Sequence, residues 1–362
     1  MVKLIKFIDR IIGTPLCFLL GLFVRKRQQL DGDRILFIQL WSIGESILTL
    51  PAMKALMEQR KDAVFTILCT ESNLAVFEAA GLKARIMTVS PGLGGTILSN
   101  FRKYDIAVDF EEFLNVSALL SFFLAKQRVG FSHGARSGLY TQSVAYNDKQ
   151  HVTSTFYDLV KLVDEKCIRQ SLPHLLSSAE DRGHARSFLR EGKKNIVIVA
   201  GAGDSAKSRI WPHFPELCSK LGGHIVFVGS KSERPFIEKV IEKTSHDSMA
   251  NAAGLLTVKQ LFSLIEMADA VISNDTGPVH VASAQQTPTV ALYGPNLPAR
   301  FGALAKNSVN IYAQGSCPLS PCINVHKGQV PDCLYPKRGP DYQKCMKAIS
   351  VEEVLEAVKR NS

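Results

Sequence analysis

The chain has 362 residues, of which 46% are hydrophobic and 21% are charged. This composition is typical of a folded globular protein and excludes a disordered or fibrous one. Because this length exceeds what one hydrophobic core usually serves, we expect two domains of ordinary size. The 43 Lys and Arg residues outnumber the 33 Asp and Glu residues, and the net charge of +10 favours an anionic partner such as a lipid surface or a phosphorylated small molecule. Because no nucleic-acid-binding motif accompanies this charge, we expect no nucleic-acid partner.

The amino-terminal segment 1–30 contains an unbroken apolar run from Ile11 to Val24. Basic residues flank this run on both sides, namely Lys3, Lys6, Arg10, Arg25, Lys26 and Arg27. A helix of this length would extend about 21 Å, which is short of a hydrocarbon core of about 30 Å. The basic cluster also stands where a signal peptide needs small residues for cleavage. We therefore expect a segment that binds the membrane surface, and the alternative is a helix docked on the protein's own core.

Strand-like and helix-like runs alternate from Arg34 onward, which predicts a parallel sheet with crossover helices. In the first half, the expected elements are strands at 35–40, 63–70, 84–90 and 105–110 and helices at 46–59, 72–80, 93–104, 115–126 and 153–166. The polar segment 169–194 lacks strand character, so it is the candidate linker.

The same alternation restarts after the candidate linker. In the second half, the expected elements are strands at 195–203, 224–230, 268–275 and 287–295 and helices at 233–243, 257–268 and from about 212 onward. A final amphipathic helix has Ser350 as its N-cap, and Glu353 completes a capping box. The predicted fold class is α/β, with two Rossmann-like doubly wound domains facing a cleft. The expected boundaries are 31–175 for the N-terminal domain, 190–348 for the C-terminal domain and 349–362 for the C-terminal helix.

An acid, a hydroxyl, a glycine and a histidine gather where one predicted strand ends, at Asp275, Thr276, Gly277 and His280. Pro278 suits the first position of a helix, with Thr276 or Gly277 as the cap. The free backbone N–H groups and the helix dipole would then form an anion site that suits a phosphate. The alternatives are an ordinary capped turn and a histidine that packs in the core.

The run "VAGAGDSAKSRIWP" follows another predicted strand and contains G-x-G-x-x-A at Gly201, Gly203 and Ala206. This spacing resembles a dinucleotide-binding turn. However, basic residues intervene before the next helix, and no acid follows at the distance that ribose binding needs. We therefore expect the glycines to let the backbone approach a phosphate whose charge Lys207 or Arg209 neutralises.

The stretch "SIGESILTLPAMKAL" follows the first predicted strand and contains Ser42, Gly44 and Glu45. Ser42 and Glu45 match S-x-x-E, so one interpretation is a capping box. The functional interpretation places Glu45 as a carboxylate at a turn opened by glycine, where it could act as a general base.

Four of the eight cysteines cluster after the last predicted strand, at Cys317, Cys322, Cys333 and Cys345. Four thiolates can hold a structural zinc ion, although the paired C-x2-C spacing typical of such sites is missing. The alternatives are free thiols or, in an exported chain, disulfides.

In their order and spacing, the three stretches together resemble glycosyltransferase family 9, the heptosyltransferases of lipopolysaccharide assembly. The resemblance covers residues 34–300 and the last helix, and D-T-G-x-x-H from Asp275 to His280 is its most specific part. It implies a GT-B fold, with the nucleotide-sugar donor mainly on the second domain and the acceptor on the first. It also implies inverting transfer that requires no metal or other cofactor. One base suffices for inversion, because the acceptor hydroxyl attacks from the face opposite the departing diphosphate.

The resemblance also implies roles for individual residues. Glu45 stands where the family usually has a catalytic Asp, and Arg209 stands where it typically has a Lys facing the donor phosphates. The catalytic candidates are therefore Glu45 and Arg209. The donor-binding candidates are Gly203, Lys207, Arg209, Glu233, Asp275, Thr276, Gly277 and His280, with Glu233 at the nucleoside ribose. Ser42 and Gly44 are the acceptor-side candidates.

The activity implied by the resemblance is transfer of a sugar to lipopolysaccharide core or a related cell-envelope glycan. The expected donor is ADP-heptose, the expected acceptor is of the lipid A-core type, and the expected place is the cytoplasmic face of the inner membrane. Two other classes of protein stay open: a non-catalytic nucleotide-sugar or lipid A-binding protein of the same fold, and a nicotinamide-dependent oxidoreductase. The sequence leaves open the sugar and its nucleotide, the acceptor hydroxyl and the oligomeric state.

Overall fold

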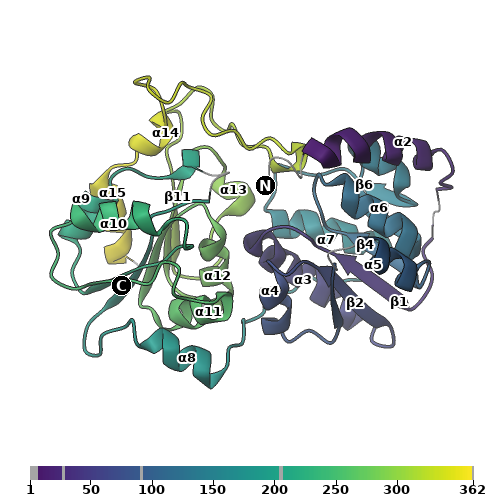
Figure 1. Cartoon of the computed structure of the whole chain (residues 1–362), viewed down its shortest axis with the longest axis horizontal. Coiled ribbons are helices and arrows are strands. Elements are labelled where there is room, and N and C mark those ends of the chain that lie inside the picture. Colours follow the sequence, from purple (N-terminus) through teal and green to yellow (C-terminus); the bar gives the residue numbers. More distant parts are fainter. Residues whose placement is uncertain (1–6, 27–28, 90–92, 204–206, 361–362) are drawn as a thin grey trace. The chain divides into compact units, whose positions relative to one another are not determined.

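The computed structural model describes residues 7–26, 29–89, 93–203 and 207–360. Four residues named above lie outside the described residues: Lys3, Lys6, Arg27 and Ala206. The chain divides into two compact units, each built on one six-stranded sheet (Figure 1). The N-terminal unit comprises Met1–Pro173 and His326–Gly328, and the C-terminal unit comprises His174–Val325 and Gln329–Ser362.

The N-terminal sheet has the strand order β3-β2-β1-β4-β5-β6, and all neighbouring strands are parallel. Its strands are β1 (Arg34–Ile38), β2 (Val64–Cys69), β3 (Arg85–Thr88), β4 (Tyr104–Asp109), β5 (Ala125–Phe131) and β6 (Gln142–Val144). The first four match predicted strands, whereas β5 and β6 were not expected. The strand order reverses between β1 and β4, where Ile38 pairs with Asp109.

Helices cover both faces of this sheet (Figure 1). Since connections between parallel strands are right-handed, a reversal of strand order moves the connecting helices to the other face. Accordingly, α3 packs with α4 and α7, whereas α5 packs with α6. The bounds are α3 (Ile43–Gln59), α4 (Leu74–Ala79), α5 (Leu93–Asn100), α6 (Asn115–Leu124) and α7 (Val152–Val163).

The amino-terminal segment forms a π-helix, η1 (Asp9–Gly13), that continues into α2 (Thr14–Gly21). The Asp9 carboxylate accepts hydrogen bonds from the backbone N–H groups of Asn115, at 3.0 Å, and Val116, at 2.7 Å. These are the first amides of α6, so Asp9 caps that helix from outside it. The segment is thus docked on the N-terminal unit.

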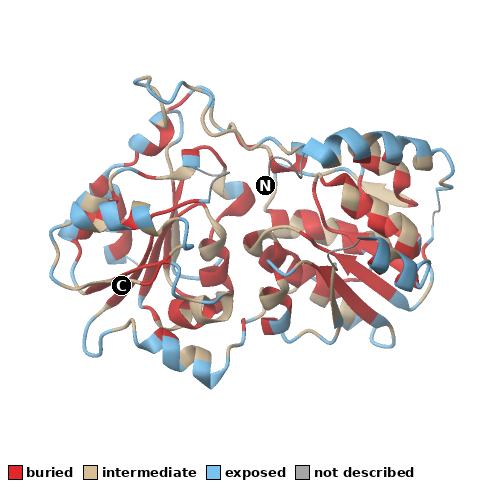
Figure 2. Ribbon diagram, in the orientation of Figure 1, coloured by how far each residue is buried: buried red, intermediate tan, exposed pale blue. Residues whose placement is uncertain are grey.

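The two faces of α2 differ. One face packs on the 3-10 helix η2 (Ala135–Leu139), where Gly21 meets the backbone of Gly138 and Cys17 is buried. This face agrees with the docked-helix alternative. Figure 2 colours most of this segment as exposed. Its exposed large hydrophobic residues are Phe7, Ile8, Ile11, Ile12, Leu16, Phe18, Leu19, Leu22 and Phe23. Within the described residues, none of the helices combines the length and the apolarity needed to cross a bilayer.

The C-terminal sheet repeats the topology, with the order β12-β11-β10-β7-β8-β9 and parallel neighbours throughout. Its strands are β7 (Asn195–Val199), β8 (His224–Phe227), β9 (Met249–Asn251), β10 (Ala270–Asn274), β11 (Thr289–Tyr293) and β12 (Ser308–Tyr312). Here the order reverses between β7 and β10.

Two groups of helices accompany this sheet. α9 packs with α10 and α15, whereas α11 packs with α12 and α8. Their bounds are α8 (Ala179–Arg186), α9 (Phe214–Lys220), α10 (Arg234–Glu242), α11 (Val258–Met267), α12 (Gly277–Gln285) and α15 (Val351–Arg360). Short elements complete the unit: η3 (Lys207–Arg209), α13 (Pro298–Phe301) and α14 (Lys344–Lys347). The 3-10 helix η4 (Val325–Lys327) precedes α14 in the chain, and its residues His326 and Lys327 are assigned to the N-terminal unit.

The last helix is part of the core of the C-terminal unit. Val354 and Val358 of α15 are buried in the same cluster as Trp211, whose indole N–H donates to the backbone oxygen of Ile349 at 3.0 Å. Ser350 Oγ accepts a hydrogen bond from the backbone N–H three residues later, as its predicted role as N-cap requires.

Candidate functional site

Each sheet reverses its strand order once, and in doubly wound folds ligands bind outside the carboxyl ends of the strands at such a reversal. The reversals lie between β1 and β4 and between β7 and β10. We call these places the N-terminal and the C-terminal switch point. The predicted acceptor-side residues follow β1, and the predicted donor-binding residues follow β7, β8 and β10. The sequence motifs therefore fall where this fold binds ligands.

The turn from β1 into α3 carries the predicted base. Ser42 has a backbone φ of 60°, a value that few residues other than glycine adopt, and α3 begins at the next residue. Ser42 Oγ accepts a hydrogen bond from the backbone N–H of Glu45 at 3.2 Å, so the predicted N-cap is present. Gly44 is buried in this turn, while the Glu45 side chain is half-buried, as a base that must reach a substrate requires.

A second acid, Glu111, lies at the N-terminal switch point just after β4, and the sequence patterns do not single it out. Glu111 is only 2% exposed, and its Oε1 accepts hydrogen bonds from the backbone N–H groups of Leu40, at 2.6 Å, and Trp41, at 2.7 Å. Burial, together with the nearby Glu45 carboxylate, raises the pKa of Glu111 to about 8. The N-terminal switch point therefore carries two interacting carboxyl groups.

A buried ion pair anchors the end of β4. Asp109 Oδ2 accepts hydrogen bonds from Arg136 Nη2, at 2.9 Å, and from the Tyr140 hydroxyl, at 2.7 Å. The guanidinium neutralises the Asp109 carboxylate, so this carboxylate can stay in the core without an unpaired charge. Asp109 Oδ1 in turn accepts from the backbone N–H of Glu111 at 3.1 Å. The ion pair thus fixes the backbone that presents Glu111.

Asn274, the last residue of β10, connects the two strands of the C-terminal switch point. Its Nδ2 donates to the backbone oxygens of Val199, Ala200 and Gly201 at 3.0 to 3.3 Å. Its Oδ1 accepts from the backbone N–H of Trp211 at 3.0 Å. Sequence reasoning missed this role, because asparagine at a strand end is also common in ordinary turns.

Arg209 and Asp275, both predicted donor-binding residues, lie against each other. Arg209 Nη1 donates to the Asp275 backbone oxygen at 2.8 Å and lies 3.3 Å from its carboxylate Oδ2. Asn296, which the sequence patterns did not indicate, donates to the same Oδ2 at 3.0 Å. Within the described residues, the buried Nε of Arg209 has no hydrogen-bond partner. A buried donor of this kind is costly unless a ligand satisfies it.

Three further donor-binding candidates follow β7 and β8, namely Gly203, Lys207 and Glu233. Glu233 Oε2 accepts from the backbone N–H of Ser230 at 2.7 Å and from its hydroxyl at 2.6 Å, so Glu233 stabilises the turn before α10. Its carboxyl group also lies against Gly201, where a Cβ would come within 2.5 Å of Oε1. Gly203 is exposed after β7, and Lys207 is exposed as the first residue of η3.

The amino terminus of α12 has the features of an anion site. Thr276 is the N-cap and Gly277 the first helical residue, so Pro278 takes the second position. The Thr276 side chain makes no capping hydrogen bond and instead donates to the Asn274 backbone oxygen at 3.2 Å, which leaves the first amides to other acceptors. His280, one turn further, is 5% exposed, as in the core-packed interpretation.

Comparison with known proteins assigns the family. A sequence model described as "Glycosyltransferase family 9 (heptosyltransferase)" matches residues 100–327, which is more than half of the chain. The chain belongs to glycosyltransferase family 9. The resemblance carried by the three stretches is therefore confirmed, and the protein is a glycosyltransferase.

Individual family 9 proteins resemble this chain at low identity. The lipopolysaccharide core heptosyltransferase OpsX of Haemophilus influenzae is 24% identical over 229 residues, which cover 59% of this chain and 65% of OpsX, less than two thirds of its length. Lipooligosaccharide heptosyltransferase 2 of Campylobacter jejuni is 22% identical over 330 residues, which cover 88% of this chain and 94% of that protein.

A solved structure shows the same fold. The ADP-heptose lps heptosyltransferase II of E. coli matches with a TM-score of 0.71 and 20% identity, covering 91% of this chain and 98% of that one. The predicted fold class, two Rossmann-like doubly wound domains of the GT-B type, is confirmed.

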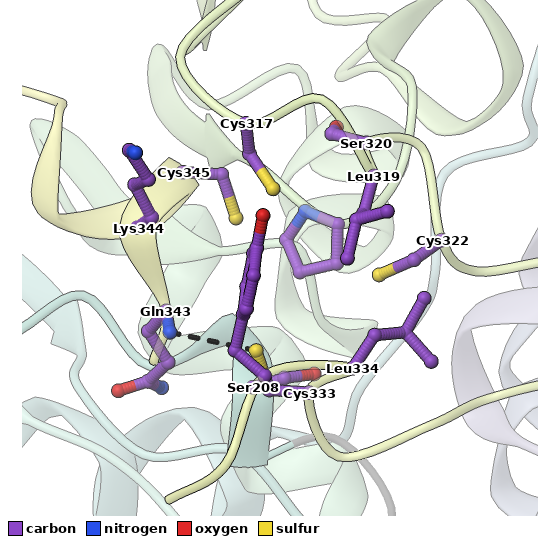
Figure 3. Close-up of a pocket in the computed structure, with 12 residues that line it drawn as sticks. Ser208, Cys317, Leu319, Ser320, Cys322, Cys333, Leu334, Gln343, Lys344 and Cys345 are labelled. Carbon is purple, nitrogen blue, oxygen red and sulfur yellow. Dashed lines mark hydrogen bonds between the residues drawn. The ribbon is translucent and has the colours of Figure 1, made fainter. Parts of the chain in front are cut away.

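The four clustered cysteines of this family 9 protein line one small pocket, and Figure 3 shows their thiols spread around its wall. Burial and the neighbouring Cys317 thiol raise the pKa of Cys345 to about 12, so this thiol is protonated. Within the described part of the chain, which includes all four, no group of three or more metal-ligating side chains is arranged to hold a metal ion. The predicted structural zinc site is not confirmed: the cysteines are free thiols.

Proposed function

We propose that this chain transfers heptose from ADP-heptose to lipopolysaccharide core or a related cell-envelope glycan, with inversion at the sugar carbon and without a required cofactor. The observation that carries the proposal is the placement of Arg209 at the C-terminal switch point in a chain of family 9. Asp275 holds this side chain, and its buried Nε has no hydrogen-bond partner among the residues that the structure describes. The named relatives are heptosyltransferases, and one of them is an ADP-heptose enzyme.

The C-terminal switch point supplies what a sugar diphosphate needs. Arg209 offers a planar cation for the phosphates, and the first amides of α12, at Thr276 and Gly277, offer backbone donors. A charge-assisted hydrogen bond contributes about 1.5 to 3 kcal/mol, whereas a charge at a helix end contributes about 0.3 to 1 kcal/mol. Arg209 should therefore stabilise the departing ADP more than any single amide of the helix does.

Further donor contacts complete the proposal. Gly203 lets the backbone approach the phosphates, Lys207 adds charge from the start of η3, and Glu233 binds the nucleoside ribose. Asp275 and His280 contribute at the inner side of the donor site, Asp275 chiefly by orienting Arg209.

The N-terminal switch point supplies the base. Glu45 takes the proton from the attacking acceptor hydroxyl, and Ser42 and Gly44 shape the turn that presents it. The oxygen–carbon bond to the acceptor forms as the carbon–oxygen bond to the diphosphate breaks, so the negative charge leaves with ADP. Because this is a single displacement, one carboxylate is sufficient.

Transfer is tested with the whole chain, ADP-heptose and a lipid A-core acceptor that lacks heptose. We expect acceptor-dependent release of ADP and a product heavier by one heptose, measured by mass spectrometry. Binding of ADP-heptose without release of ADP under any acceptor condition would contradict the proposal and favour the non-catalytic binding protein. A panel of UDP-sugars and GDP-sugars serves as the control for the nucleotide.

We further propose that the chain acts at the cytoplasmic face of the inner membrane, bound through the exposed side of α2 and the turn that follows it. Phe18, Leu22 and Phe23 are 64%, 69% and 82% exposed, and Arg10 and Arg25 are exposed nearby. Apolar side chains beside basic ones suit shallow insertion into an anionic lipid surface.

Flotation with phosphatidylglycerol and phosphatidylcholine vesicles tests this site. We expect binding to the anionic vesicles, and we expect a variant with Phe18, Leu22 and Phe23 all changed to Ser to lose most of it. The matched control changes three exposed hydrophobic residues elsewhere, Ile168, Leu176 and Leu304, to Ser and should still bind. Equal binding by both triple variants would contradict the membrane site.

A further inference from the structure

We infer that Glu111 is a positioning residue for Glu45: it holds the turn that carries the base, and its negative charge makes Glu45 a stronger base. The inference rests on the proposed function, because it assigns Glu111 to the same transfer reaction. It goes beyond that function in naming a second carboxyl group that the reaction depends on.

Glu111 determines how the chain leaves β1. A single carboxylate oxygen accepts from two successive backbone N–H groups, those of Leu40 and Trp41, at 2.6 and 2.7 Å. The Gln39 side-chain amide donates to the same oxygen at 3.2 Å. The next residue is Ser42, whose φ of 60° turns the chain into α3, and Glu45 lies in the first turn of that helix. Loss of the acceptor would leave these amides without their partner and free the turn.

The surrounding charges do not neutralise Glu111. The titratable groups that act on it are Glu45 of α3, Asp109 of β4 and Arg136 of η2. Arg136 Nη2 makes its hydrogen bonds to Asp109, to the Tyr140 hydroxyl and to a serine, so this cation is already engaged with Asp109. The group is therefore rich in negative charge, and each carboxylate raises the proton affinity of its neighbour.

This arrangement predicts how the pair responds to pH. With its pKa near 8, Glu111 is mainly protonated at neutral pH and can accept through Oε1 while it carries its proton on the other oxygen. As the pH rises through 8, Glu111 loses that proton and places a negative charge beside Glu45. Glu45 then takes the proton of the acceptor hydroxyl more readily, so the rate of transfer should rise.

The first experiment measures kcat and KM for transfer between pH 6 and 9.5. In the wild type we expect kcat to rise about threefold across pH 8. Glu111→Gln keeps an oxygen acceptor for the two amides but cannot ionise, so its kcat should match the wild type at pH 6.5 and lack the rise.

Glu111→Ala removes the acceptor and should lower kcat at every pH while leaving donor affinity unchanged. The control is Glu58→Gln, at the far end of α3 from Glu45, and it should keep the wild-type pH profile of kcat. A Glu111→Gln profile identical to the wild type would overturn the inference.

The second experiment does not depend on transfer. A group whose pKa is raised in the folded state binds more protons there than in the unfolded chain, so stability falls as the pH rises from about 4.5 toward 8. The midpoint of thermal unfolding of the wild type should therefore fall over this range relative to Glu111→Gln. In a Glu45→Gln background this fall should shrink, because the neighbouring charge is gone. If the unfolding midpoint falls equally with Glu45 present and in the Glu45→Gln background, the coupling between the two carboxyl groups is contradicted. If the coupling is found but the chain transfers no heptose, only the proposed function is contradicted.

Discussion

The two switch points share one topology and carry opposite chemistry. After β1 and β4 the chain places two carboxyl groups, Glu45 and Glu111, and the pKa of Glu111 is raised by burial and by the Glu45 carboxylate. After β7 and β10 it places a guanidinium and the amino terminus of α12, which favour binding an anion. The same strand order thus provides the place for a site in both units, while the side chains set its chemistry: a base in our proposal for the N-terminal unit and a phosphate-binding site in our proposal for the C-terminal unit.

Each switch point also has one side chain that bridges its two strands. Asn274 bridges β10 to the end of β7 with a neutral amide, and Glu111 bridges β4 to the end of β1 with an ionisable carboxyl. The bridges are alike in geometry and differ in charge. Because a carboxyl group ionises and a side-chain amide does not, the N-terminal bridge can respond to pH and the C-terminal bridge cannot.

The largest effect is expected from removing the base. Glu45→Gln should lower kcat by about a hundredfold to ten-thousandfold, the usual contribution of a general base, because the amide cannot accept the proton. Calorimetry should find ADP-heptose affinity unchanged, since the donor residues that we propose belong to the other unit. Glu45→Asp, the acid usual in the family, should retain part of the rate. Near-normal transfer by Glu45→Gln would show that Glu45 is not the base. The chemical contrast between the two switch points would then no longer hold.

Arg209→Ala should weaken ADP-heptose binding by about tenfold to a hundredfold, the loss expected for a charge-assisted hydrogen bond. It should also lower stability, because Asp275 is buried and would lose its cation. Arg209→Lys serves as the control, since it keeps the charge without the planar fork. Unchanged calorimetric affinity in the Ala variant would assign the phosphates to Lys207 instead.

A smaller effect, on stability, is expected from removing Asn274, the neutral bridge of the C-terminal switch point. Asn274→Ala should lower the free energy of unfolding by about 1 to 3 kcal/mol, because it removes the partner of the buried Trp211 N–H and of three backbone oxygens. The loss should be the same from pH 5 to pH 8.5, as measured by urea unfolding at several pH values. A loss that varies with pH would show that this bridge is not the neutral counterpart of Glu111.

The smallest effect is expected in the cysteine pocket, which includes residues of neither bridge. Cys333→Ser should leave transfer within about twofold and stability within about 1 kcal/mol, because a half-buried thiol is replaced by a hydroxyl of similar size. Incubation with a chelator should leave the thermal unfolding of the wild type unchanged. A chelator-dependent fall in unfolding temperature would show that these thiols hold a metal after all.

Most of the strands could be predicted, because their apolar runs are long and buried on both faces. β5 could not, since its sequence "AKQRVGF" places three polar residues in a row, and the run 115–126 was interpreted as one helix. In the structure α6 ends at Leu124, and Gln127 and Arg128 are buried with hydrogen bonds to backbone oxygens. Polar side chains like these can be buried in a sheet only where residues distant in the sequence satisfy their hydrogen bonds.

The alternation of strand-like and helix-like runs indicated the fold class, and the motifs in three stretches indicated the family and the candidate residues at each strand end, because such patterns are local properties of the chain. The positions of Glu45 and Arg209 in those motifs also identified them as the catalytic candidates. Tertiary structure alone decided that Glu111 accepts from Leu40 and Trp41, that Asp275 holds Arg209, and that four nearby cysteines stay free thiols. The physical reason is that burial and hydrogen bonding between residues far apart in the chain depend on strand register and side-chain packing, which no local pattern encodes.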